Sequence, residues 1–120
     1  MKLPLKAALL ISLFLPLTAG CGARREITVG AILCTSGEGA YYGQAIQQGM
    51  ALARERVNQE GGVAGSPLRI LYRDSGSSPD QAAKAAVELY DRLNVPAILG
   101  GVLSSETLRI APSPSNVTRS

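Results

Sequence analysis

The chain has 120 residues, and 12 lysine and arginine side chains against 9 aspartate and glutamate give a net charge of +3. Removing Lys2 and Lys6 with an N-terminal leader leaves 10 against 9, which excludes the clustered basic face that nucleic-acid binding requires. The chain contains no histidine, so it cannot form the common zinc sites or the Ser-His and Cys-His nucleophile pairs. We therefore expect no metal, no cofactor, no catalytic residue and no nucleic-acid partner.

The first 21 residues have the pattern of an export signal. Two lysines precede an uncharged apolar stretch over 7–15, which is shorter than the roughly 20 residues that a membrane-spanning helix needs. The segment from Leu17 to Cys21 (LTAGC) resembles a bacterial lipobox, in which the cysteine sulfur takes a diacylglycerol and the chain is cut just before it. We expect residues 1–20 to be a lipoprotein signal peptide and residues 21–25 a lipidated linker. A plain secretory signal, or a buried helix with a chance cysteine, stay open as alternatives.

Such a protein would be exported and lipid-anchored to the bacterial membrane, facing the periplasm or the cell exterior. Cys21 would be its first residue. Cys34 is then the one remaining cysteine, which excludes an internal disulfide. Because it ends a strand-like run, we expect a small, partly buried core residue in preference to a reactive thiol.

The first predicted elements are a strand and a helix. The apolar, partly β-branched run over 27–33 (ITVGAIL) is typical of a strand covered on both faces. From Ala45 onward the apolar residues recur at helical spacing, and Gly61-Gly62 stops the pattern. The apolar positions of this helix are Ile46, Met50, Ala53 and Val57.

Strand and helix continue to alternate in the second half of the chain. The pattern predicts a strand over 68–72, a helix over 80–93, a strand over 97–99 that runs towards Val102, and a helix from Ser104. Asn94-Val95-Pro96 breaks the helix, since proline disfavours helical geometry in the residue before it. Short strands separated by helices call for parallel strands, so we expect an α/β fold with an open parallel sheet and flanking helices. For the strand order we take 2-1-3.

Two segments that combine glycine with hydroxyl groups follow the first and third strands. They are 34–43 (CTSGEGAYYG) and 100–107 (GGVLSSET). Open α/β sheets bind ligands at the carboxyl ends of their strands, and in this strand order the crevice lies between the first and third. Glycines let the backbone approach a ligand closely. A helix that starts at Ser104 or Ser105 presents unpaired N–H groups, so these N–H groups and the Ser104 hydroxyl could receive a carboxylate.

The same residues also have structural interpretations that need no ligand. Ser104 and Ser105 could simply cap the helix, as serines commonly do, and Glu106 already supplies negative charge there. Tyr41 and Tyr42 could merely cover the start of the first helix.

Four motifs occur in an order that resembles the leucine-binding-protein class of type I periplasmic binding proteins, the extracytoplasmic receptors of ABC importers for branched-chain and related amino acids. They lie at 40–44 (AYYGQ), at 57–65 (VNQEGGVAG), at 72–82 (YRDSGSSPDQA) and at 100–105 (GGVLSS). The resemblance implies that Ser104 receives the α-carboxylate of an amino acid, with Leu103 and Ser105 adjoining it. It also implies that Tyr42 lines the pocket for the ligand's side chain. An ABC permease and a small-molecule ligand are the implied partners.

The chain departs from this class in two places. Ser77 and Leu103 stand near the positions where some members carry a disulfide, so that bridge is absent. After Pro112 the helical pattern gives way to a Pro- and Ser-rich tail over 113–120, which we expect to be disordered or aberrant. Residues 26–112 would then form part of the N-terminal lobe, with the other half of the binding cleft outside this sequence.

Two other functions stay open. Gly37-Glu38-Gly39 follows a strand, as in a nucleotide-binding enzyme domain, but Gly43 comes one residue too late for the full fingerprint and Asp74 lies too far along the chain. A ligand-sensing regulatory lipoprotein would share the fold without transporting anything, and fold alone does not separate the two roles.

Overall fold

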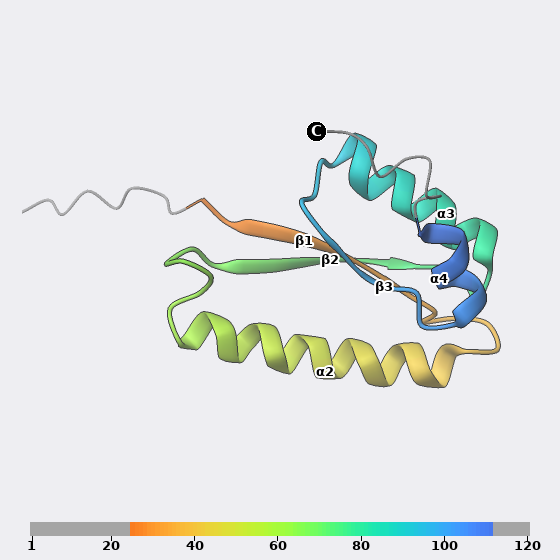
Figure 1. Ribbon diagram of the computed structural model, residues 1–120. Coiled ribbons are helices and arrows are strands. Elements are labelled where there is room, and N and C mark those ends of the chain that lie inside the picture. Colours follow the sequence, from red (N-terminus) through yellow and green to blue (C-terminus); the bar gives the residue numbers. More distant parts are fainter. Residues whose placement is uncertain (1–24, 112–120) are drawn as a thin grey trace, which may run out of the picture.

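The computed structural model describes residues 25–111, in which three strands and their connecting helices form three layers (Figure 1). The predictions for the signal peptide over 1–20, for lipidation at Cys21 and for the tail over 113–120 lie outside the described residues. The elements in chain order are β1 (Ile27–Leu33), α2 (Ala40–Gln59), β2 (Leu68–Asp74), α3 (Pro79–Val87), the π-helix η1 (Glu88–Arg92), β3 (Ile98–Gly100) and α4 (Ser104–Ile110).

The sheet has the order β2-β1-β3 and all its strands are parallel, as predicted. β1 pairs with β2 along its whole length, from Ile27 opposite Leu68 to Leu33 opposite Asp74, whereas β3 pairs only with residues 30–32. The central place of β1 follows from its continuous apolar run, since a strand with neighbours on both edges and layers on both faces meets little water. The predicted fold class is therefore confirmed.

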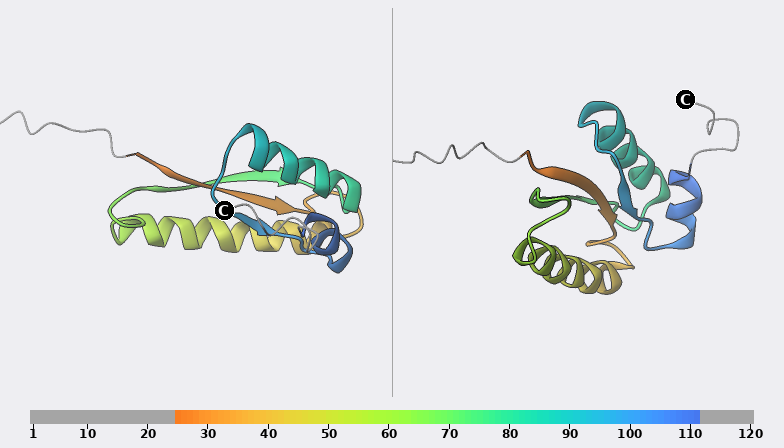
Figure 2. Two further views of the ribbon diagram at one scale, coloured as in Figure 1. Left: turned by 45° about the horizontal axis from the view of Figure 1, so that its top comes forward. Right: turned by 60° about the vertical axis from the view of Figure 1, so that its left-hand side comes forward.

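The helices cover the two faces of the sheet unequally. α2 lies on one face, and α3, η1 and α4 lie on the other (Figures 1 and 2). The main core lies on the α3 side, where Ile32 and Leu89 are fully buried. The remaining buried members of this cluster are Ala82, Ala85, Ala86 and Val95. Small alanines let α3 approach the sheet closely, so most of the dense packing is on this side.

α2 is long and ends where the sequence predicts. Gly61 and Gly62 adopt positive φ angles of 105° and 78°, which only glycine takes up readily, and this turns the chain back towards the sheet. Asn58 then ties the end of the helix to β2. Its side-chain amide donates to the Leu68 carbonyl at 2.9 Å, and its oxygen accepts the Leu68 N–H at 2.7 Å. These bonds explain why asparagine stands before the two glycines in the motif at 57–65.

The start of α2 differs from the prediction. The helix begins at Ala40, five residues before the predicted Ala45, so Tyr41 and Tyr42 lie in its first turn and not in a loop. Gly43, which resembles a loop glycine in sequence, is the one buried residue of the helix. A Cβ atom there would lie 2.0 Å from the Cys34 carbonyl oxygen, so glycine is required for packing.

Three further element boundaries differ from the predicted ones. β2 continues for two residues beyond Tyr72, because Arg73 donates to both carboxylate oxygens of Glu88, at 3.1 and 2.8 Å, and is thereby accommodated against η1. The predicted helix over 80–93 is split into α3 and η1, and Leu93, its last predicted residue, lies after η1 and is 44% exposed. β3 covers Ile98–Gly100 and stops there because Gly101, with φ of 81°, turns the chain away.

Candidate functional site

The turns that follow β1, β2 and β3 meet at one end of the sheet, which we call the carboxyl edge. Because the strands are parallel, all three turns lie at this end, and so do the first residues of α2, α3 and α4. Figures 1 and 2 show the starts of α2 and α4 at this same end. The two glycine- and hydroxyl-rich segments are thus brought to one edge, as the strand order predicts.

Asp74 joins the turn after β1 to the turn after β2. Its Oδ1 accepts the backbone N–H groups of Thr35 (2.9 Å), Ser36 (3.2 Å) and Gly76 (2.9 Å), and its Oδ2 accepts the Ser36 hydroxyl at 2.5 Å. Burial on its own would raise the pKa of Asp74, but the Ser36 hydroxyl and the backbone N–H groups together lower it from 3.8 to about 2. The carboxylate is therefore charged at neutral pH and holds the two turns together by hydrogen bonds.

Ser77 strengthens the same junction. Its hydroxyl donates to the Ser36 carbonyl at 2.8 Å and accepts the Gly39 N–H at 2.9 Å, just before α2 begins. Cys34 is fully buried beneath this loop and its thiol donates to the Gly39 carbonyl. Burial, followed by the nearby Glu106 carboxylate, raises the pKa of Cys34, so its thiol stays protonated, in agreement with the expected core role.

The turn between β3 and α4 contains the two glycines of the GGVLSS motif. A Cβ on Gly100 would lie 2.1 Å from the Ile32 carbonyl oxygen, and one on Gly101 would lie 2.3 Å from the Thr107 hydroxyl. The Thr107 hydroxyl donates to the Gly101 carbonyl at 2.7 Å. These contacts give both glycines a packing role within the protein, whereas their place in the sequence suggests a close approach of ligand.

Ser104 and Ser105 are the first two residues of α4, and neither is its N-cap. The N-cap position belongs to Leu103, whose N–H donates to the Glu106 carboxylate at 3.3 Å. Simple capping by a serine hydroxyl is therefore not what these residues do. Both serines are exposed, and among residues 25–111 their backbone N–H groups have no acceptor.

Of the four residues predicted to bind ligand, three lie in one turn and the fourth lies on another helix. Leu103, Ser104 and Ser105 share one turn, which we call the serine turn, and Leu103 is partly buried in it. Tyr42 projects from α2, is 61% exposed and meets Tyr41 edge to face, with their ring centroids 5.7 Å apart. Among the described residues no hydrogen bond joins Tyr42 to the serine turn, and the two parts belong to helices that begin at the same edge of the sheet.

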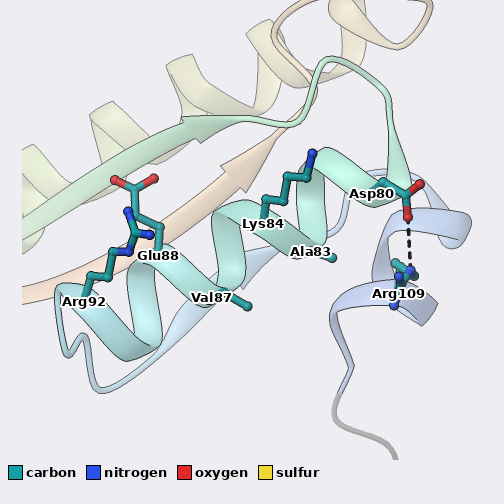
Figure 3. A pocket seen from close by; sticks show the side chains of 7 residues that line it. All are labelled: Asp80, Ala83, Lys84, Val87, Glu88, Arg92 and Arg109. Atoms are coloured by element: carbon teal, nitrogen blue, oxygen red, sulfur yellow. Dashed lines mark hydrogen bonds and ion pairs between the residues drawn. The ribbon is translucent and has the colours of Figure 1, made fainter.

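A hollow of about 830 Å³ lies elsewhere, along the outer side of α3 (Figure 3). Asp80 and Arg109 face each other across one end of it with an N–O distance of 3.3 Å, joining α3 to α4. The other lining residues are Ala83, Lys84, Val87, Glu88 and Arg92. The mixture of both charge signs gives no preference for one ligand class, and none of the four predicted binding residues lines it.

Two residues that shape the edge, Asp74 and Ser75, have no role in the predictions from sequence, and Glu106 is predicted only as a negative charge at the start of the helix. In sequence, Asp74 stands out only as part of a motif and as an acid too distant for a nucleotide site. An aspartate at the end of a strand and directly before Ser-Gly is typical of side-chain to backbone bonding in turns, and this signal could have identified Asp74. The pairing of Ser75 with Glu106 joins residues 31 positions apart, and no local pattern reveals it.

The helices of residues 25–111 do not include one with the length and apolar character that crossing a bilayer requires. Within the same range no three His, Cys, Asp or Glu side chains come together as metal ligands would.

Comparison with known proteins agrees with the resemblance in sequence. The family described as "Periplasmic binding protein" matches residues 26–115. A Leu/Ile/Val-binding protein, BraC3 of Rhizobium johnstonii, is 34% identical over 83 residues, which are 68% of this chain and 21% of that protein. The chain thus spans about a fifth of the length of this relative.

Two solved structures show the same arrangement of elements. The branched-chain amino acid transporter substrate binding protein LivJ of Streptococcus pneumoniae, in complex with isoleucine, has a TM-score of 0.70 and 30% identity, over 72% of this chain and 25% of that one. A fatty acid ABC transporter substrate-binding protein of Thermomonospora curvata has a TM-score of 0.59 and 33% identity, over 72% and 22%. The chain therefore belongs to the periplasmic binding protein family, and its described residues have part of the leucine-binding-protein type of fold.

Proposed function

We propose that the chain acts in an extracytoplasmic solute-binding receptor of an ABC importer, where it binds the carboxylate of a branched-chain or related amino acid for delivery to a membrane permease. The observation that carries this proposal is the exposed serine turn. Two neighbouring N–H groups without an acceptor among the described residues, and two exposed hydroxyls, stand at the carboxyl edge of a parallel sheet. A carboxylate supplies the acceptors that these donors lack.

Each predicted residue has a role in this proposal. The hydroxyl and N–H of Ser104 and the N–H of Ser105 bind the two carboxylate oxygens. Leu103 adjoins the carboxylate and orients the turn, and Tyr42 contacts the ligand's side chain from α2. Hydrogen bonds from several N–H groups to a charged oxygen are roughly twice as strong as neutral ones, so the turn contributes most of the affinity.

The ligands named for the two solved structures fit this division of roles. Isoleucine and fatty acids differ in size, and only isoleucine carries an ammonium group, but both carry a carboxylate. Recognition of a carboxylate by the serine turn is compatible with either ligand. We assign a branched-chain amino acid because the Rhizobium relative is a Leu/Ile/Val-binding protein.

The proposal includes export and anchoring. Residues 1–20 serve as the signal peptide and a lipid on Cys21 holds residues 26–112, as part of an N-terminal lobe, close to the permease in the membrane. More than one acyl chain is needed for stable attachment, which a modified cysteine would supply. Mass spectrometry of the mature N-terminus tests this part, and an unmodified chain that begins at Met1 would contradict it.

Binding is tested by titrating the 120-residue chain with isoleucine and following backbone amide signals by NMR. We expect shifts at Ser104 and Ser105, and Ser104→Ala should weaken binding roughly ten- to a hundredfold, as expected for loss of a hydrogen bond to a charged group. Ser66→Ala, at the opposite end of the sheet, is the matched control and should bind as the parent does.

Two further ligands test which part of the amino acid the chain recognises. Isoleucinol lacks the carboxylate and should not bind, whereas octanoate tests whether the carboxylate alone suffices. Binding of isoleucinol as tightly as isoleucine, or unchanged affinity in Ser104→Ala, would show that the serine turn does not recognise the carboxylate.

A further inference from the structure

Two buried polar side chains connect the turn after β2 to the first turn of α4. Ser75 and Glu106 are both fully buried, and the Ser75 hydroxyl donates to Glu106 Oε1 at 2.5 Å. The other carboxylate oxygen accepts the Leu103 N–H. Burying a carboxylate costs free energy unless hydrogen bonds compensate for the lost water. An apolar side chain would fill the same space without this cost, so the placement calls for a role beyond packing.

Ser75 is itself held by its backbone. Its N–H donates to the Leu33 carbonyl at the end of β1 (2.9 Å), and its carbonyl accepts the Ser78 N–H at the start of α3 (3.0 Å). The Ser75 backbone is therefore held against both the central strand and α3, which fixes where its hydroxyl lies. Any side chain that bonds to it is positioned relative to the sheet.

Glu106 connects the Ser75 hydroxyl to the serine turn, because one carboxylate oxygen bonds to each. By accepting the Leu103 N–H it uses one of the free donors at the start of α4 inside the protein. The Leu103 carbonyl in turn accepts the N–H groups of Glu106 and Thr107, both at 3.0 Å. The next two donors, on Ser104 and Ser105, are left without an acceptor among residues 25–111.

We infer that Ser75 and Glu106 form a positioning pair, which holds the turn between β3 and α4 so that Ser104 and Ser105 present their N–H groups outward. Neither residue contacts the ligand. The role in ligand binding rests on the proposed function, but the positioning of the turn follows from the buried contacts themselves.

The positioning is tested by amide hydrogen exchange on the 120-residue chain. Ser75→Ala removes the hydroxyl with little change in volume and leaves Glu106 short of one donor. We expect exchange at 103–106 to rise on the order of tenfold while exchange in β1 stays unchanged, since a buried charged acceptor loses a partner. Glu106→Gln is the second variant. An amide has no charge and only one oxygen, so the Ser75 hydroxyl must either share that oxygen with the Leu103 N–H or turn to accept from the amide NH2. Either way a charge-assisted bond becomes a neutral one, so the same segment should loosen.

Ser78→Ala is the matched control. Ser78 lies three residues from Ser75 and its hydroxyl caps α3 by accepting the Gln81 N–H, without a hydrogen bond to α4. Loss of this cap destabilises the protein but should leave exchange at 103–106 as in the parent. The inference is wrong if Ser75→Ala and Glu106→Gln exchange as Ser78→Ala does, or if they accelerate exchange equally over β1 and α4.

Isoleucine titration then connects the pair to the ligand. Ser75→Ala should weaken isoleucine binding about tenfold, whereas Ser78→Ala should not. A parent chain that binds no isoleucine would contradict the proposed function, and the exchange measurement would still decide whether the pair positions the turn. Unchanged binding in Ser75→Ala, with faster exchange at 103–106, would show that the ligand does not depend on this position.

Discussion

Asp74 illustrates how much one side chain can organise at the carboxyl edge. It accepts three backbone N–H groups and one hydroxyl from two turns. Thr35 and Ser36 in the first turn lie 39 and 38 residues before Asp74, and Gly76 in the second lies two residues after it. Loop backbone at the end of a sheet has no strand partner, so these donors need another acceptor. The hydrogen bonds from Asp74 hold the turn after β1 in place, so the chain enters α2 in a defined direction.

The low pKa of Asp74 predicts a pH dependence of stability. Because the folded-state pKa, about 2, lies below the ordinary value of 3.8, the stabilisation is fully present above pH 4 and is lost as pH falls through 2. Asp74→Asn should lower the free energy of unfolding at pH 6 by about 1 kcal/mol, after allowing for solvent screening of this exposed carboxylate.

Urea unfolding of the parent and of Asp74→Asn between pH 2 and pH 6 measures this difference. It should shrink as pH falls, with Asp91→Asn, an exposed aspartate of η1, as the control for removing one carboxylate. A difference that is constant over the whole range would show that the Asp74 charge does not stabilise the fold.

At the scale of elements, the sequence predicts well where local chemistry and tertiary packing agree. β1 has the predicted bounds because its apolar, β-branched run suits a central strand. α3 begins one residue before the prediction, at Pro79, where a serine cap and a proline at the first position mark a helix start. The parallel direction of the strands follows from the alternation of elements.

Prediction fails where a long-range contact decides the structure. Gly39 and Gly43 suggest a loop, but Gly43 lies inside α2 because the helix packs against the Cys34 carbonyl. The position of the serine turn could be predicted from the strand order, and its hydrogen bonds could not. The Glu106 bond to Ser75 depends on how α4 docks, which no spacing in the chain encodes.

The two glycines of α2 provide a matched test of this explanation. Gly43→Ala should lower the free energy of unfolding by about 2 kcal/mol or more, because the added Cβ would lie 2.0 Å from the Cys34 oxygen and the helix must move. Gly49→Ala meets nothing within 4 Å and should stabilise the protein by up to about 1 kcal/mol through helix propensity. Thermal or urea unfolding followed by circular dichroism measures both changes. Equal effects of the two substitutions would disprove the packing role of Gly43.

For the whole molecule, the two sides of the sheet differ in how much apolar surface they bury. The α3 side contains the fully buried Ile32 and Leu89, and Leu89 also lies against Gly30, where an added Cβ would approach it to 2.8 Å. On the other side, α2 leaves Leu52 69% exposed and Ile46 39% exposed. The free energy of folding should therefore come mainly from the α3 side.

This asymmetry predicts different effects for two leucine substitutions in helices on opposite faces of the sheet. Leu89→Ala should lower the free energy of unfolding by about 2 to 5 kcal/mol, since it leaves a cavity in the main core. That is a large part of the total for a domain of this size, which is of the order of 5 to 10 kcal/mol. Leu52→Ala should change it by no more than about 0.5 kcal/mol, because the side chain is already mostly in water. Urea unfolding followed by circular dichroism compares the two variants, and a loss in Leu52→Ala as large as that in Leu89→Ala would place an equal share of the core beneath α2.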